Sequence, residues 1–134
     1  MKTVDYSKSL EELENDYWGK PEFESHVVKT CHSMRKKPLK EITVEELRLV
    51  IGQGFSLQYL IPMAIELLKS NILAEGDLYE GDLLTSVIST PTFDYWKNNK
   101  HHWLTVKQLI DQNSNRITDK IILSKIPAFE KIHN

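Results

Sequence analysis

The chain has 134 residues with a formal net charge of −2; 40% of its residues are hydrophobic and 27% are charged. This length fits one domain that buries about two thirds of its unfolded surface, so we expect a single domain over residues 1–134. The composition is typical of a soluble globular protein, and the net charge excludes a generally basic nucleic-acid binder.

Two features of the sequence indicate the cellular compartment. The single cysteine, Cys31, excludes an internal disulfide and fits a reducing environment. The first residues lack the apolar segment of a signal peptide, and no run of about 20 apolar residues could span a membrane. We therefore expect a cytoplasmic protein that has no membrane partner.

Helix signals begin near the N-terminus. Ser-Leu-Glu-Glu from Ser9 is a capping-box pattern, which predicts a short helix to about Asn15. Apolar residues at helical spacing predict a second helix from Glu22 to about Lys36, which Pro38 stops. A second capping box at Thr43–Glu46 predicts the start of a third helix.

The stretch from Leu47 to Leu84 organises the rest of the chain. Gly52-Gln53-Gly54 predicts a tight break, because glycine adopts backbone angles that other residues avoid. An apolar stripe then predicts a central helix over about Leu57–Leu68. Pro62 lies inside this pattern, so we expect the helix either to begin near Tyr59 or to kink.

An acidic loop follows the central helix and ends at Asp82, which we expect to be the N-cap of a helix that starts at Leu83. Shorter helices are predicted at residues 93–96, 102–112 and 118–125, although residues 120–123 could also form a strand. We therefore expect an all-α fold, a compact single-domain array of about six or seven short helices around the central helix.

We find no catalytic constellation and no cofactor motif. His26, Cys31 and His32 share one predicted helix, but His26 and His32 are six residues apart and do not share a face, so we expect no metal site. Cys31 lies in an apolar stripe, which is typical of core packing, although a small enzyme that uses an accessible thiol stays an alternative. Dinucleotide-binding, P-loop, serine-hydrolase and zinc-protease motifs do not occur, so we expect no enzyme, no cofactor and no small-molecule substrate.

Charge is unevenly distributed along the chain. Residues 1–28 carry seven acids and three bases, residues 29–41 carry one acid and five bases, and residues 42–82 carry seven acids and two bases. Solvated helix faces and an acidic surface that meets a cationic partner account equally well for this pattern. An acidic helical body without catalytic residues favours a binding protein.

An ordered set of short motifs, including "LR-IGQ" and "GDLL", extends over about residues 9–96. The motif residues are Ser9-Leu10-Glu11-Glu12-Leu13-Glu14, Trp18-Gly19, Cys31-His32, Lys37-Pro38-Leu39, Thr43-Val44-Glu45-Glu46-Leu47-Arg48, Ile51-Gly52-Gln53, Leu57, Tyr59-Leu60-Ile61-Pro62, Ala64, Gly81-Asp82-Leu83-Leu84 and Trp96. In this ordered set the chain resembles the immunity proteins of bacterial contact-dependent growth inhibition (CDI) systems.

This resemblance implies a small cytosolic antidote that binds the C-terminal toxin domain of its cognate CDI effector tightly and non-covalently. Many such toxins are nucleases, including enzymes that cleave tRNA, and their active sites are basic because they hold phosphates. An acidic immunity surface would then mimic nucleic acid and occlude the active site, without binding nucleic acid itself.

The acidic loop supplies the candidate contact surface, because it protrudes between two buried elements. The candidate partner-binding residues are Glu75, Asp77, Tyr79, Glu80 and, as an aromatic anchor, Tyr95. Tyr79 and the glycines beside it could instead only fix the turn. A rival acidic surface consists of Glu11, Glu12, Glu14 and Asp16.

The alternative function is a nucleic-acid-associated regulator that uses the helices around Gly52-Gln53-Gly54 as a helix-turn-helix. The second helix of this pair is nearly all apolar, however, whereas a recognition helix needs polar side chains. The immunity function is therefore the preferred hypothesis.

Overall fold

The computed structural model describes residues 4–19 and 25–133, and this part of the chain is built from helices. In these residues the only extended pairing is a single bridge between Ser9 and Pro38. The all-α prediction is confirmed, with eight α-helices in the described residues where six or seven were expected. They are α1 (Leu10–Glu14), α2 (His26–Met34), α3 (Val44–Gly52), α4 (Leu57–Ser70), α5 (Asp82–Val87), α6 (Phe93–Asn98), α7 (Lys100–Gln112) and α8 (Lys120–Glu130), with 3-10 turns at Leu39–Glu41, Thr90–Thr92 and Lys131–His133.

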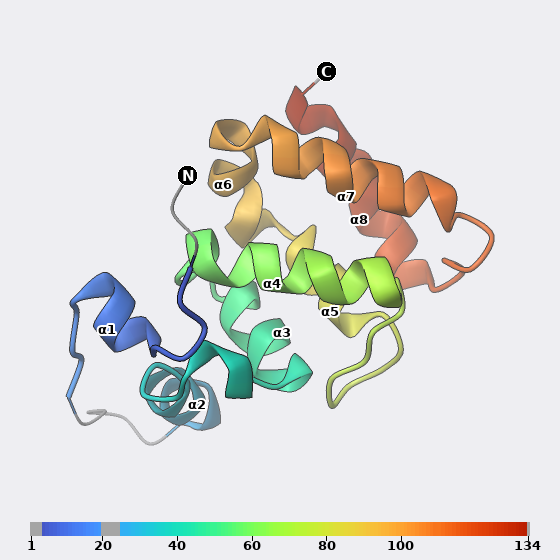
Figure 1. Cartoon of the computed structure of the whole chain (residues 1–134). Helices are drawn as coiled ribbons and strands as arrows, with labels where there is room; N and C mark the ends of the chain where they lie inside the picture. Colours follow the sequence, from blue (N-terminus) through green and yellow to red (C-terminus); the bar gives the residue numbers. More distant parts are fainter. Residues whose placement is uncertain (1–3, 20–24, 134) are drawn as a thin grey trace.

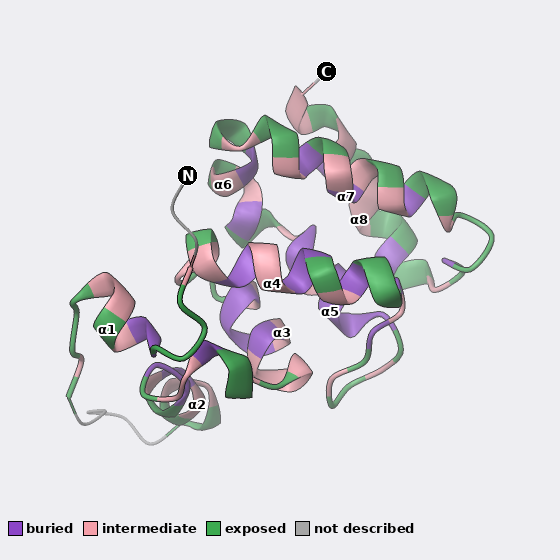
Figure 2. Cartoon of the chain, in the orientation of Figure 1, coloured by how far each residue is buried: buried purple, intermediate pink, exposed green. Residues whose placement is uncertain are grey.

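Helix α4 crosses the middle of the molecule, with α1, α2 and α3 on one side and α6, α7 and α8 on the other (Figure 1). Its inward stripe is fully covered (Figure 2), and the buried residues are Leu60, Ile61, Ala64, Ile65 and Leu68. The central helix is therefore confirmed. It begins at Leu57 and continues through Pro62, because the proline forfeits only one backbone hydrogen bond in a helix whose burial holds it in place.

The α-helices that precede α4 each begin at a residue whose side chain caps the helix locally. Ser9 and Thr43 both form complete capping boxes with the glutamate three residues later, as predicted. Helix α2 begins at His26, later than the expected start at Glu22, because Ser25 is extended and accepts a hydrogen bond from the amide of Val28. The predicted first turn of this helix falls on residues outside the described part of the chain.

The break between α3 and α4 is tight. Gly54 has a φ of +80°, and an added Cβ would lie 3.1 Å from the carbonyl oxygen of Pro91. Only glycine combines this backbone angle with so close an approach. The turn therefore brings the start of α4 against the 3-10 turn that leads into α6.

The C-terminal helices close the other side of the core. Helix α8 starts at the Asp119 cap and extends past Lys125, so the strand alternative at this point is wrong. The ring of Phe129 packs edge-on against Trp96, and the Phe129 carbonyl accepts a hydrogen bond from the Trp103 indole at 2.9 Å. Burial of these rings holds the end of the helix through Pro127.

None of the helices in residues 4–19 and 25–133 combines the length and the hydrophobicity needed to cross a membrane.

Candidate partner-binding surface

The loop between α4 and α5 folds around a buried carboxylate. We call residues 75–81 the acidic turn. Asp82 is only 2% exposed, and its carboxylate accepts hydrogen bonds from the backbone amides of Gly76 at 2.7 Å, Leu78 at 2.9 Å and Tyr79 at 3.4 Å. The expected N-cap role of Asp82 is wrong: α5 begins at Asp82 itself, and its N-cap is Gly81 with a φ of +89°. The Asp82 side chain thus holds the loop that precedes it.

A second clamp reaches the acidic turn from α3. Glu45 accepts a hydrogen bond from the amide of Asp77 at 2.8 Å. Arg48 holds both oxygens of Glu45 at 2.6 and 2.5 Å and lies 3.8 Å from the Asp82 carboxylate. These hydrogen bonds from Arg48, together with the Asp77 amide, lower the pKa of Glu45 despite its partial burial. The acidic turn is therefore fixed from both sides by charge-assisted hydrogen bonds.

The acidic turn displays free carboxylates. Glu75, Asp77 and Glu80 are exposed, and none of them forms an ion pair with a residue that the structure describes. Between them, the side chain of Leu78 is 63% exposed. Sequence reasoning missed Leu78, although an apolar residue between acids and glycines in a polar loop was the available signal.

Tyr79 has a structural part in the turn. It is partly buried, and its hydroxyl donates to the Thr85 hydroxyl at 3.0 Å. This bond ties the turn to the first helical turns of α5. The open alternative, in which Tyr79 fixes the turn, is thereby supported by a specific contact.

Tyr95 lies apart from the acidic turn. It is on α6 and borders a groove at the first turn of α4, whereas the acidic turn follows the last turn of α4. The 14 residues of this helix separate the two by roughly 20 Å. The Tyr95 hydroxyl bonds to His102 Nδ1 at 2.7 Å, and burial raises the pKa of Tyr95 to about 12. The phenol therefore stays protonated, and burial, aided by His101, lowers the pKa of His102.

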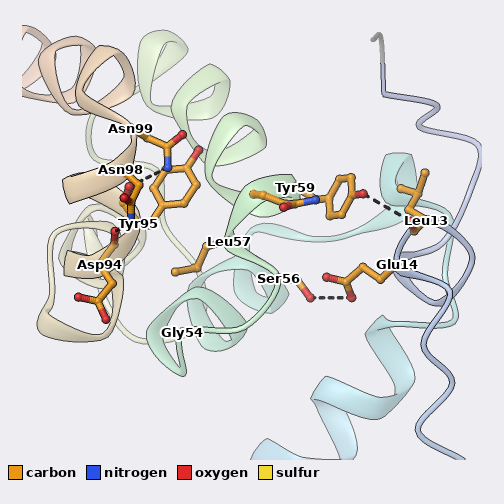
Figure 3. Close-up of a pocket in the computed structure, with 11 residues that line it drawn as sticks. Leu13, Glu14, Gly54, Ser56, Leu57, Tyr59, Asp94, Tyr95, Asn98 and Asn99 are labelled. Carbon is orange, nitrogen blue, oxygen red and sulfur yellow. Dashed lines mark hydrogen bonds between the residues drawn. The ribbon is translucent and has the colours of Figure 1, made fainter.

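The groove beside Tyr95 has a volume of about 720 Å³ and lies between α1, α4 and α6. Figure 3 shows the α6 side chains on one wall, Tyr59 with the end of α1 on the other, and Leu57 between them. We call it the α1–α6 groove. Its lining residues are Leu13, Glu14, Gly54, Ser56, Leu57, Gln58, Tyr59, Asp94, Tyr95, Asn98 and Asn99.

The acids of α1 are largely engaged within the fold. Glu12 completes the capping box by accepting from the amide of Ser9. Glu14 accepts from Arg35 at 2.5 Å, and the side chain of Arg35 is only 3% exposed. Asp16 is exposed and accepts a hydrogen bond from the Trp18 indole at 3.2 Å. This rival surface therefore offers fewer free carboxylates than the acidic turn.

The structure also bears on the alternative chemistries. Cys31 is buried, and burial raises the pKa of its thiol, so it is neither accessible nor poised to be a nucleophile. No group of three or more His, Cys, Asp or Glu side chains within residues 4–19 and 25–133 could hold a metal ion. Helices α3 and α4 do form a helix-turn-helix pair, but the charged side chains on α4 are only Glu66 and Lys69, which pair with each other at 2.9 Å.

Comparison with known proteins identifies the family of this chain. No curated protein and no solved structure matches the chain. Residues 12–118 match the family described as CDI immunity proteins, a region that includes the acidic turn, Tyr95 and every helix from α2 to α7. The match spans well over half of the chain and confirms the family expected from the short motifs. The chain belongs to the CDI immunity proteins.

Proposed function

We propose that this protein neutralises the C-terminal toxin domain of a cognate CDI effector by tight, non-covalent binding through the acidic turn. The observation that carries the proposal is a set of exposed carboxylates on a turn whose backbone amides are bound by Asp82 and Glu45. The same turn supports a basic, phosphate-binding toxin, and thus a nuclease, as the target.

Preorganisation is the physical reason for choosing this turn. Binding costs free energy when loops and side chains must be ordered at the interface. The buried Asp82 carboxylate and the Glu45–Arg48 pair hold the backbone of the acidic turn before any partner arrives. The turn therefore presents Glu75, Asp77 and Glu80 without a large ordering cost.

The charges and Leu78 have separate parts in binding. Unpaired acids attract a basic toxin over a distance and raise the association rate. Leu78, 63% exposed at the same turn, buries apolar surface once the two proteins meet. Carboxylates that sit where the toxin holds phosphates would exclude nucleic acid from its active site.

Co-purification tests the immunity role itself. The chain is expressed together with the toxin-like open reading frame immediately upstream of it, with a tag on the upstream product alone. A stable stoichiometric pair, and toxicity of the upstream product when expressed without its partner, are expected. If no pair forms and no toxicity appears, the proposed function fails.

A charge-reversal variant then tests the surface. We expect Glu75→Lys/Asp77→Lys/Glu80→Lys to weaken toxin binding by 100-fold or more (~3 kcal/mol), because several close charge contacts turn repulsive. The matched control is Glu41→Lys/Glu66→Lys/Asp111→Lys, which changes the net charge equally at exposed acids outside the turn. Equal weakening by both variants would mean that only net charge affects toxin binding, and the acidic turn would not be the contact surface.

A further inference from the structure

We propose that the α1–α6 groove binds an arginine side chain of the toxin, as a second contact separate from the acidic turn. This inference rests on the proposed function, because the arginine belongs to the toxin. It gives Tyr95 a binding role of its own, some 20 Å away from the turn with which the sequence grouped it.

Hydrogen-bond acceptors face the groove from α6 and from Asn99, which caps the end of this helix. The side-chain amide of Asn98 donates to the carbonyl of Asp94 at 2.9 Å, and that of Asn99 donates to the carbonyl of Tyr95 at 2.7 Å. One N–H of each amide is thus used locally, while neither side-chain oxygen accepts a bond from any residue in the described part of the chain. The Asp94 carboxylate lies on the same wall and is almost fully exposed.

The opposite wall supplies one more acceptor. One oxygen of Glu14 is bound by Arg35 and by the hydroxyl of Ser56. Its second oxygen accepts nothing from the residues described. No lysine, arginine or histidine lines the groove, and its two carboxylates, Glu14 and Asp94, each keep one oxygen that pairs with no residue in the described part of the chain.

The cations near the groove, Arg35 and Lys97, do not occupy its free acceptors. Arg35 is buried and already engaged with Glu14 and with the carbonyl of Asp16. Lys97 approaches Asp94 only to 3.6 Å, and both side chains are mostly exposed. Such an exposed pair contributes little free energy, so an incoming cation can replace it.

The shape of the groove favours a guanidinium over an ammonium ion. A guanidinium is planar, carries five N–H donors and stacks on aromatic rings, whereas an ammonium is a compact and strongly hydrated charge. Here the acceptors are spread over two walls, and the phenol rings of Tyr59 and Tyr95 border the space between them (Figure 3). Leu57 at the centre offers an apolar contact for the methylene stem.

The test places positive charge in the groove and measures binding of the upstream toxin domain by calorimetry. Gln58→Lys/Asn98→Lys changes two exposed lining residues outside the core, and its matched control is Gln108→Lys/Gln112→Lys on the exposed face of α7. We expect the groove variant to weaken binding by about 10-fold or more and the control to bind as the wild type does. If the wild type binds the toxin and the groove variant binds it equally well, the arginine site is wrong while the immunity role stands.

A double-mutant cycle identifies the arginine. Each interface arginine of the toxin is changed to alanine and measured against the wild-type chain and against the groove variant. For one arginine, the change to alanine should lower the affinity of the toxin for the wild-type chain. The same change should cause little further loss of affinity for the groove variant. Purely additive losses for every arginine would overturn the proposal.

A probe without the toxin separates failure of the groove from failure of the immunity role. The peptide acetyl-Gly-Arg-Gly-amide, at millimolar concentration, is titrated into labelled protein and followed by NMR. The side-chain amide signals of Asn98 and Asn99 should shift with this peptide, shift less with its lysine counterpart and not respond in the groove variant. Absence of any shift when the toxin also fails to bind would overturn both proposals, whereas shifts without toxin binding would leave a groove for arginine and no immunity role.

Discussion

Two acid-rich segments that look alike in sequence behave differently in the structure. On α1, Glu12 caps its own helix and Glu14 binds the buried Arg35. On the acidic turn, Glu75 and Glu80 are exposed and bind no cation in the described part of the chain. The two segments differ in what their carboxylate oxygens bind. The first segment is therefore a structural element, and the second is a candidate for recognition.

The two segments also differ in what holds them. A buried cation, Arg35, collects the α1 segment, whereas a buried anion, Asp82, collects the backbone amides of the acidic turn. In the first case the anchor binds the carboxylate of Glu14 itself. In the second case the anchor leaves the neighbouring acids free for a partner.

Removal of the Arg35 side chain should have the largest effect on stability. Arg35→Ala removes the cation that binds Glu14 and the carbonyl of Asp16 and that stacks 4.3 Å above Trp18. We expect a loss of about 3–5 kcal/mol in the free energy of unfolding, measured by urea denaturation. The exposed neighbour Lys36→Ala is the control and should change stability by no more than about 0.5 kcal/mol. Equal effects at the two positions would show that the α1 acids are not structural.

Loss of the Asp82 carboxylate should have the next largest effect. Asp82→Ala leaves the partly buried amides of Gly76 and Leu78 without their acceptor, at a cost of about 2–3 kcal/mol. Asp82→Asn keeps one acceptor oxygen and should lose less. Hydrogen exchange should accelerate at these two amides, and toxin binding should weaken although Asp82 itself is buried. Unchanged exchange in Asp82→Ala would mean that the turn is held by other contacts.

Local patterns predicted the helices of this fold well, because both capping boxes and the stripe of α4 depend on residues close in sequence. The helix ends were less predictable. Helix α8 continues past Lys125 because Phe129 packs between Trp96 and Trp103, which lie about 30 residues earlier. Such distant contacts carry no local signal.

The candidate surface was only partly predictable for the same reason. The exposure of Glu75, Asp77 and Glu80 follows from a polar loop between buried elements. The position of Tyr95 at the other end of α4, the use of Asp82 inside the loop and the pairing of Glu14 with Arg35 all depend on tertiary contacts. The sequence shows how many acidic residues a segment has, but only the folded structure shows which of them already bind another group.

Single alanine substitutions sharpen the comparison between the two segments. Glu12→Ala removes half of a capping box and should cost about 1 kcal/mol of stability with little effect on toxin affinity. Glu80→Ala should leave the unfolding free energy within about 0.5 kcal/mol and weaken toxin binding instead. Urea denaturation and calorimetry on both variants check these opposite patterns. If Glu12→Ala weakens binding more than Glu80→Ala does, the α1 acids form the contact.

The smallest effect is a pH dependence of the acidic turn itself. Hydrogen bonds from Arg48 lower the pKa of Glu45 below its ordinary 4.5, so the folded state binds the proton less readily than the unfolded chain does. The stability from this carboxylate is therefore complete above about pH 4.5 and is lost as the pH falls through the lowered pKa.

Glu45→Gln removes the titration, so the difference in unfolding free energy between wild type and variant should be constant above pH 4.5 and shrink below it. The amide of Asp77, which donates to Glu45, should exchange faster over the same range in the wild type. A difference that stays flat to pH 3 would mean that ionisation of Glu45 adds no stability, and that the charge of this carboxylate is not what holds the turn.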